Sequence, residues 1–170
     1  MWKFVGSVRP PFAVTPIAGQ ESVWDYPRPP AIVADARLVI VRDGTELIGK
    51  SAAALRILET ASPPTFYLPP EAIDWSLLIS VAGQSFCEWK GVARYWALAR
   101  DPHAGAVGWS YDTPNKDFSQ IARHVGFYPG RVICLVAGEQ VLPQPGGFYG
   151  GWITKELVGP FKGDPGSSGW

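Results

Sequence analysis

The sequence lacks an excess of charge of either sign and any long apolar run. Lys and Arg number 15 and Asp and Glu number 15 in 170 residues, so no broad electrostatic field favours nucleic acid or an anionic lipid surface. No run approaches the roughly 20 apolar residues that span a bilayer. Pro10 and Pro11 interrupt the N-terminal apolar residues before a signal-peptide core can form. We therefore expect a cytoplasmic protein with neither nucleic-acid nor membrane partners.

Cysteine is also scarce. Cys87 and Cys134 are too few for a disulfide framework and show no CxxC spacing. A zinc site would have to recruit His103 or His124 together with carboxylates, which departs from the usual ligand sets. We expect reduced thiols and no zinc site, and the residues themselves indicate no other cofactor.

Aromatic residues are abundant, with eight Trp, eight Phe and six Tyr. Residues 1–30 contain six of the prolines, and we expect them to form an arm that packs through its aromatic side chains. Residues 143–170 contain eight of the 19 glycines, and we expect them to form an extension packed on the core. Residues 31–142 between them form the predicted core domain. The aromatic-rich extensions also suit a homo-oligomer interface.

Short β-like runs separated by turn signals dominate the core. Residues 37–49 predict a hairpin around Asp43-Gly44, and residues 131–142 predict a second hairpin around Gly138. One helix is predicted, from Pro114 to His124. The fold class is therefore mainly β, an antiparallel sheet domain with one short late helix.

The richest stretch in reactive side chains runs from Cys87 to Trp96. Within it, Lys90 and Arg94 are near enough in sequence to lower the pKa of the Cys87 thiol, although free cysteines are more often simply buried. The predicted strand 55–60 places Glu59 on the same face as two apolar residues, where a carboxylate needs a partner. Lys90 is the expected partner, in an ion pair at the floor of a pocket.

The predicted catalytic residues are Glu59, Lys90 and Cys87. The predicted ligand-binding residues are aromatic apart from one arginine, and core packing is the alternative for the aromatic ones: Tyr67, Arg94, Tyr95, Trp96, Trp109 and Tyr128.

An ordered set of motifs resembles the bacterial domain of unknown function 427 family over roughly residues 35–140. The motifs are LRILET at 55–60, PPTFYLPPE at 63–71, CEWKGVARYW at 87–96, WSY at 109–111 and VGFY at 125–128. The segments PQPGGFYGGW and GPFKG resemble a longer subgroup of that family. The resemblance implies a compact, tent-like β fold and a nucleotidyltransferase-like label. Magnesium would be the expected cofactor of such an enzyme, but the sequence has neither a Gly-Ser loop nor an Asp-x-Asp pair.

Three functions follow from these residues. The preferred one is a β domain that binds a small molecule, with or without turnover, in a pocket lined by aromatic residues and by Glu59, Cys87 and Lys90. The second is nucleotidyl transfer, which the family label implies. The third is a non-catalytic interaction protein that assembles through its aromatic extensions.

Overall fold

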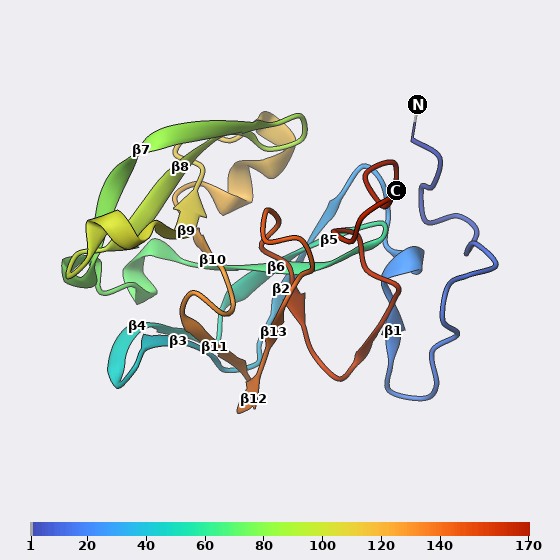
Figure 1. The fold of residues 1–170 in the computed structure, drawn as a ribbon, viewed down its shortest axis with the longest axis horizontal. Helices are drawn as coiled ribbons and strands as arrows, with labels where there is room; N and C mark the ends of the chain where they lie inside the picture. Colours follow the sequence, from blue (N-terminus) through green and yellow to red (C-terminus); the bar gives the residue numbers. More distant parts are fainter. Residues whose placement is uncertain (1) are drawn as a thin grey trace.

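A seven-stranded antiparallel sheet is the main element of the computed structural model, which describes residues 2–170 (Figure 1). The strands lie in the order β2-β5-β6-β10-β9-β8-β7. Their bounds are β2 (Ala31–Asp35), β5 (Ala54–Glu59), β6 (Ser62–Leu68), β7 (Leu78–Cys87), β8 (Gly91–Leu98), β9 (Ala106–Ser110) and β10 (Val125–Phe127). The predicted fold class, mainly β and antiparallel, is confirmed.

A second sheet of four strands has the order β12-β11-β3-β4. Its strands are β3 (Val39–Asp43), β4 (Glu46–Ser51), β11 (Ile133–Val136) and β12 (Glu139–Gln140). Asp43 pairs with Glu46 and Val136 pairs with Glu139, so each connection is a two-residue turn that contains a glycine with positive φ. Both predicted hairpins are confirmed.

The largest apolar core contains residues of both sheets. Val41 and Ile48 of the four-stranded sheet pack in one cluster with Phe66 and Phe127 of the seven-stranded sheet. Successive side chains of a strand point to opposite faces, so Tyr67, between Phe66 and Leu68, belongs to a second cluster on the other face. That second face carries the candidate site.

The late helix is present as a 3₁₀ segment, η5 (Lys116–Ile121), and not as the α-helix expected over residues 114–124. Tyr111 bridges to Ala122, and the backbone N–H of Arg123 donates to the Tyr111 carbonyl at 2.8 Å. These bonds join residues on either side of the segment, and its six residues form about two turns at 3.0 residues per turn. The other helical segments within residues 2–170 are four 3₁₀ turns of three residues each: η1 (Val23–Asp25), η2 (Pro70–Ala72), η3 (Trp75–Leu77) and η4 (Pro102–Ala104).

No helical segment within residues 2–170 has the length and apolar character needed to cross a membrane.

The N-terminal arm and the C-terminal extension pack against each other at one side of the molecule (Figure 1). Strand β1 (Glu21–Ser22) pairs in parallel with β15 (Leu157–Val158). Trp24 is fully buried, with the rings of Phe4, Phe12 and Trp170 packed around it at centroid distances of 5.1 to 5.2 Å. A short pair in the extension, β13 (Leu142–Pro143) with β14 (Trp152–Ile153), places Trp152 in the main core. These aromatic rings pack within the chain, and the expected homo-oligomer stays a prediction.

Candidate functional site

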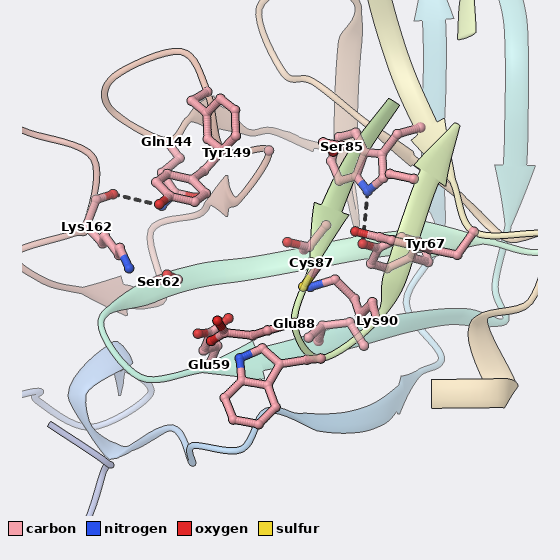
Figure 2. Close-up of a pocket in the computed structure, with 18 of the residues that line it drawn as sticks. Glu59, Ser62, Tyr67, Ser85, Cys87, Glu88, Lys90, Gln144, Tyr149 and Lys162 are labelled. Carbon is pink, nitrogen blue, oxygen red and sulfur yellow. Dashed lines mark hydrogen bonds between the residues drawn. The ribbon is translucent and has the colours of Figure 1, made fainter. Parts of the chain in front are cut away.

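The candidate site is a cavity of about 300 Å³ on the face of the seven-stranded sheet opposite the main core (Figure 2). The β5–β6 hairpin, the β7–β8 hairpin, strand β9, the segment after β10 and the C-terminal extension all contribute to its lining. Seven of the nine residues that the sequence predicted for the site line this cavity: Glu59, Tyr67, Cys87, Lys90, Tyr95, Trp109 and Tyr128.

The turn of the β7–β8 hairpin carries Cys87 and Lys90 into the cavity (Figure 2). Cys87 pairs with Gly91, so three residues form the turn, and the φ of 98° at Gly91 is one that glycine adopts readily. Asn115 holds this turn in place. Its Nδ2 donates to the Trp89 carbonyl at 2.8 Å, and its backbone N–H donates to the Lys90 carbonyl at 3.1 Å. The thiol and the ammonium therefore project from a fixed backbone.

Aromatic rings form one wall. The Trp109 Nε1 donates to the Tyr67 hydroxyl at 3.0 Å, and the ring centroids of Trp109 and Tyr128 lie 4.6 Å apart. Burial raises the pKa of Tyr67. Burial, reinforced by Tyr95, raises the pKa of Tyr128 to about 12 against the opposing charge of Arg131. Both phenols are therefore neutral at physiological pH, and this wall of the cavity carries no charge.

Two further tyrosines bring hydroxyl groups to the cavity. The Tyr95 hydroxyl donates to Ser85 Oγ at 2.7 Å, across the β7–β8 pair. Tyr111 is 4% exposed, and burial raises the pKa of its phenol, while the nearby Lys90 charge opposes that change. Tyr111 was not among the predicted site residues, although its two-residue spacing from Trp109 is the period that places side chains on one strand face.

Glu59 lines the cavity, but its ion-pair partner is Arg28 and not Lys90, so the expected Glu59–Lys90 pair is wrong. The Arg28 Nε lies 3.3 Å from Glu59 Oε1, and the Arg28 side chain is 1% exposed. Its terminal nitrogens donate to the carbonyls of Phe4 at 3.1 Å and Thr60 at 2.9 Å. Lys90 forms no ion pair with any of residues 2–170. The alternation of side chains along the strand correctly placed Glu59 on the cavity face. Its ion-pair partner, however, comes from the N-terminal arm.

Residues 31–138 match a family model described as a domain of unknown function, DUF427, whose short label is NTP_transf_9. The chain belongs to this family. The match includes the whole seven-stranded sheet and strands β3, β4 and β11 of the smaller sheet. The resemblance noted over residues 35–140 is confirmed, and the resemblance of the C-terminal segments to a longer subgroup stays a prediction. No curated protein gives a significant match to the chain. The DUF427 description assigns no reaction.

Segments outside the DUF427 match complete the cavity, and sequence reasoning missed them as site residues. Trp2 comes from the N-terminal arm, and the rest come from the C-terminal extension: Gln144, Phe148, Tyr149, Gly150 and Lys162. Two signals could have identified them. The aromatic pair in the Gly-rich segment suits stacking on a ligand, and the Phe161-Lys162-Gly163 tripeptide echoes Trp89-Lys90-Gly91 at the hairpin turn.

Lys162 is the most buried charged side chain of the cavity lining, with 6% of its surface exposed. Its Nζ donates to the backbone oxygen of Trp170 at 3.1 Å and lies 5.0 Å from the ring centroid of Trp2 and 5.5 Å from that of Tyr149. Gln144 fixes the backbone here, because its Nε2 donates to the Lys162 carbonyl at 2.7 Å. The ammonium is thus held among aromatic rings.

Arg94 and Trp96 lie away from the cavity. Arg94 is exposed, pairs with Asp112 at 3.2 Å and donates to Ser80 Oγ at 3.1 Å. Trp96 packs against the main core and stacks edge-on with Trp75 at a centroid distance of 4.9 Å. Both alternate with Tyr95 along β8, and Tyr95 lines the cavity, so the placement of Arg94 and Trp96 corrects their inclusion in the predicted pocket.

No group of three or more His, Cys, Asp or Glu that could hold a metal ion occurs within residues 2–170. Cys134 lies in the main core, 1% exposed, and burial raises the pKa of its thiol. Cys87 lies at the cavity and is only partly buried. The two thiols therefore differ sharply in accessibility.

Proposed function

We propose that this DUF427 protein binds a small organic molecule with a planar ring in the cavity beside Trp109. The observation that carries the proposal is the convergence, on one cavity of about 300 Å³, of stacking rings and polar groups from segments far apart in the sequence. This volume is at the lower end of the range for ligand pockets, roughly 300–1,000 Å³. A largely apolar lining with a few oriented polar groups is typical of such sites.

The lining suggests how a ligand would be held. Trp109, which is 7% exposed, and Tyr128 line the cavity beside strands β9 and β10, and Tyr149, which is 42% exposed, offers a more open ring from the C-terminal extension. Stacked aromatic pairs contribute about 0.5–1.5 kcal/mol beyond the area they bury. A planar ligand that contacts rings from both sides would therefore gain affinity without a large interface.

In this proposal Cys87 and Lys90 are the groups that act on the bound molecule. The thiol and the ammonium project from the same hairpin turn into the cavity, so a ligand in contact with the aromatic wall would meet both. Glu59 differs from them because its carboxylate is engaged by Arg28. Its part in this proposal is to hold Arg28 and the arm beneath the site.

The family label names nucleotidyl transfer as the second candidate. Such enzymes hold magnesium through carboxylates close to the phosphates of the substrate. The carboxylates that line the cavity are Glu59, which is paired with Arg28, and Glu88, which is exposed at the rim. These residues do not fit a magnesium site of that kind, and the label remains the sole support for this reaction.

A thermal-shift screen tests the proposed function. The wild-type protein is heated with a library of small aromatic metabolites and nucleotides, with and without Mg²⁺ or Mn²⁺. Planar compounds should raise the melting temperature, and Tyr149→Ala should reduce that rise. Trp75→Ala is the matched control, because Trp75 is 37% exposed and does not line the cavity.

Two results would decide between the candidates. The proposed site would be overturned if no compound in the library raised the melting temperature of the wild type more than that of Tyr149→Ala. Metal-dependent turnover of a nucleoside triphosphate would favour the family label.

A further inference from the structure

Two phenols and an indole form a buried hydrogen-bonding group in the lining of the cavity. Tyr67 is 1% exposed, Tyr111 is 4% exposed and Trp109 is 7% exposed, and all three line the cavity. The Trp109 Nε1 donates to the Tyr67 hydroxyl at 3.0 Å. Burial raises the pKa of both phenols, so each keeps its proton at physiological pH. The group therefore contains three hydrogen-bond donors, one N–H and two O–H.

These donors outnumber the hydrogen bonds that the group can form within the protein. The Tyr67 oxygen accepts the N–H of Trp109. The two phenols can share one further hydrogen bond, in which one hydroxyl donates and the other accepts. No hydrogen bond joins either hydroxyl to another acceptor within residues 2–170. One hydroxyl proton of the Tyr67–Tyr111 pair therefore has no acceptor in the protein, whichever hydroxyl donates to the other.

The neighbouring polar groups add further donors. Lys90 and Cys87 both influence the pKa of the Tyr111 phenol, so both lie near its hydroxyl. The Lys90 ammonium has three N–H donors and forms no ion pair with any of residues 2–170. Glu59, a carboxylate of the same lining, is engaged by Arg28 at 3.3 Å. This part of the cavity therefore presents donors to a bound molecule, and a matching molecule has to supply an acceptor.

We infer that the ligand is a planar ring bearing a carbonyl group, whose oxygen accepts the unpaired proton of the Tyr67–Tyr111 pair. The inference rests on the proposed function, because it names the chemical class of the molecule in the same cavity. A carbonyl oxygen has two lone pairs, so it can accept from the phenol pair and from Lys90 together. When the carbonyl is conjugated with the ring, its lone pairs lie in the ring plane, which leaves the ring faces free to contact Tyr149.

Burial and fixed geometry make this hydrogen bond selective. A buried hydroxyl without an acceptor is costly, so a ligand that lacks the carbonyl leaves the phenol pair in that state. Tyr67 lies in β6, where it pairs with Leu55 of β5 and Gly126 of β10, and Trp109 holds its hydroxyl. Tyr111 is held by its bridge to Ala122. Donors placed in this way lose little freedom when they bind a ligand.

A pair of matched probes tests the inference. Acetophenone and α-methylstyrene have nearly the same shape, but a C=CH₂ group replaces the C=O group in the second, so only the ketone accepts a hydrogen bond. Titrations followed by ¹H–¹⁵N NMR give both dissociation constants. The double variant Tyr67→Phe with Tyr111→Phe should weaken binding of the ketone roughly threefold to tenfold relative to the alkene. Tyr26→Phe is the matched control, because it removes the hydroxyl of a buried tyrosine that does not line the cavity.

A spectroscopic measurement on the wild type reports the hydrogen bond directly and does not depend on how well the double variant folds. Acetophenone labelled with ¹³C at the carbonyl carbon should keep, when bound, a carbonyl signal near its position in water, since a hydrogen bond polarises the C=O bond. In the double variant the signal should move toward its position in a hydrocarbon solvent.

Three results would overturn the inference. They are a ratio of the two affinities that the double variant leaves unchanged, a bound wild-type signal at the hydrocarbon position, and no binding of acetophenone to the wild type. If the alkene binds as a planar ligand and the hydroxyls have no effect, the inference fails and the proposed function keeps its support. The proposed function itself is judged by the comparison of the wild type with Tyr149→Ala.

Discussion

The indole ring of Trp109 lies so close to the backbone of Gly150 that a Cβ at position 150 would collide with it. Trp109 belongs to strand β9 of the DUF427 domain, and Gly150 belongs to the C-terminal extension. Gly126 approaches the same ring, where a Cβ would lie 2.7 Å from the indole. The contact of strand with extension at the cavity therefore depends on glycine.

Gly150→Ala should displace the extension from Trp109. Overpacking of this kind typically costs about 1–3 kcal/mol of folding free energy, and here it should also weaken binding of planar ligands. Urea denaturation followed by tryptophan fluorescence measures the first effect, and calorimetry measures the second. Gly169→Ala is the control, because its Cβ would meet no atom within 4 Å. Equal stability of the two variants would show that the extension is free to move away from the ring.

Glu59→Gln should destabilise the fold, because it leaves the buried Arg28 guanidinium without its counter-charge. Leaving a buried charged group unsatisfied costs about 1–3 kcal/mol or more. Asp25→Asn removes the exposed Arg9–Asp25 pair, whose side chains are 39% and 46% exposed, and should cost less than about 1 kcal/mol. Chemical denaturation of both variants gives the comparison, and a larger loss for Asp25→Asn would contradict our account of Arg28.

Lys162 should make stability depend on pH. Its pKa is lowered in the folded protein, mainly by burial, so the unfolded chain binds more protons in the window between the lowered value and the ordinary lysine value of about 10.4. Above that window the amine is neutral in both the folded and the unfolded chain, so its burial carries no charge penalty. As the pH falls through the window to the folded pKa, the unfolded chain takes up the proton first and the free energy of unfolding decreases. The wild type should therefore gain stability relative to Lys162→Met as the pH rises.

Denaturation curves of both proteins at matched pH values measure this difference. The difference in unfolding free energy between wild type and Lys155→Met should not change with pH, because Lys155 is exposed. If the difference in unfolding free energy between wild type and Lys162→Met stayed constant up to about pH 10, the amine would not be buried in solution.

The two cysteines should react at very different rates in the folded protein. Iodoacetamide should alkylate Cys87 at the cavity, whereas Cys134, 1% exposed and with its thiol pKa raised by burial, should react at least roughly tenfold more slowly. Peptide mass spectrometry resolves the two sites. Both thiols should react fully in guanidinium chloride, and a planar ligand should protect Cys87. Faster labelling of Cys134 would be incompatible with this core.

Local patterns in the sequence were sufficient for much of the fold and for one side of the site. The two-residue alternation of strand 55–60 placed Glu59 on the cavity face, and the Gly-containing turns marked both hairpins of the smaller sheet. The same alternation along β8 separates Tyr95 from Arg94 and Trp96. These features depend on neighbours within a few residues, which is why they can be read from the chain itself.

The tertiary structure alone decided which distant groups meet. Arg28 replaces Lys90 as the partner of Glu59, because the N-terminal arm passes beneath the end of β5. Lys162 reaches the cavity because Gln144 and Ala61 bind its backbone from two other segments. The helical pattern of residues 114–124 corresponds to the 3₁₀ segment η5, and Arg123, which follows it, donates its backbone N–H to the Tyr111 carbonyl. Each of these contacts depends on the path of loops and extensions, which local periodicity does not encode. The sequence by itself thus determined a β domain and the sheet side of its cavity, and the packing of the two extensions supplied the cavity's buried positive charge.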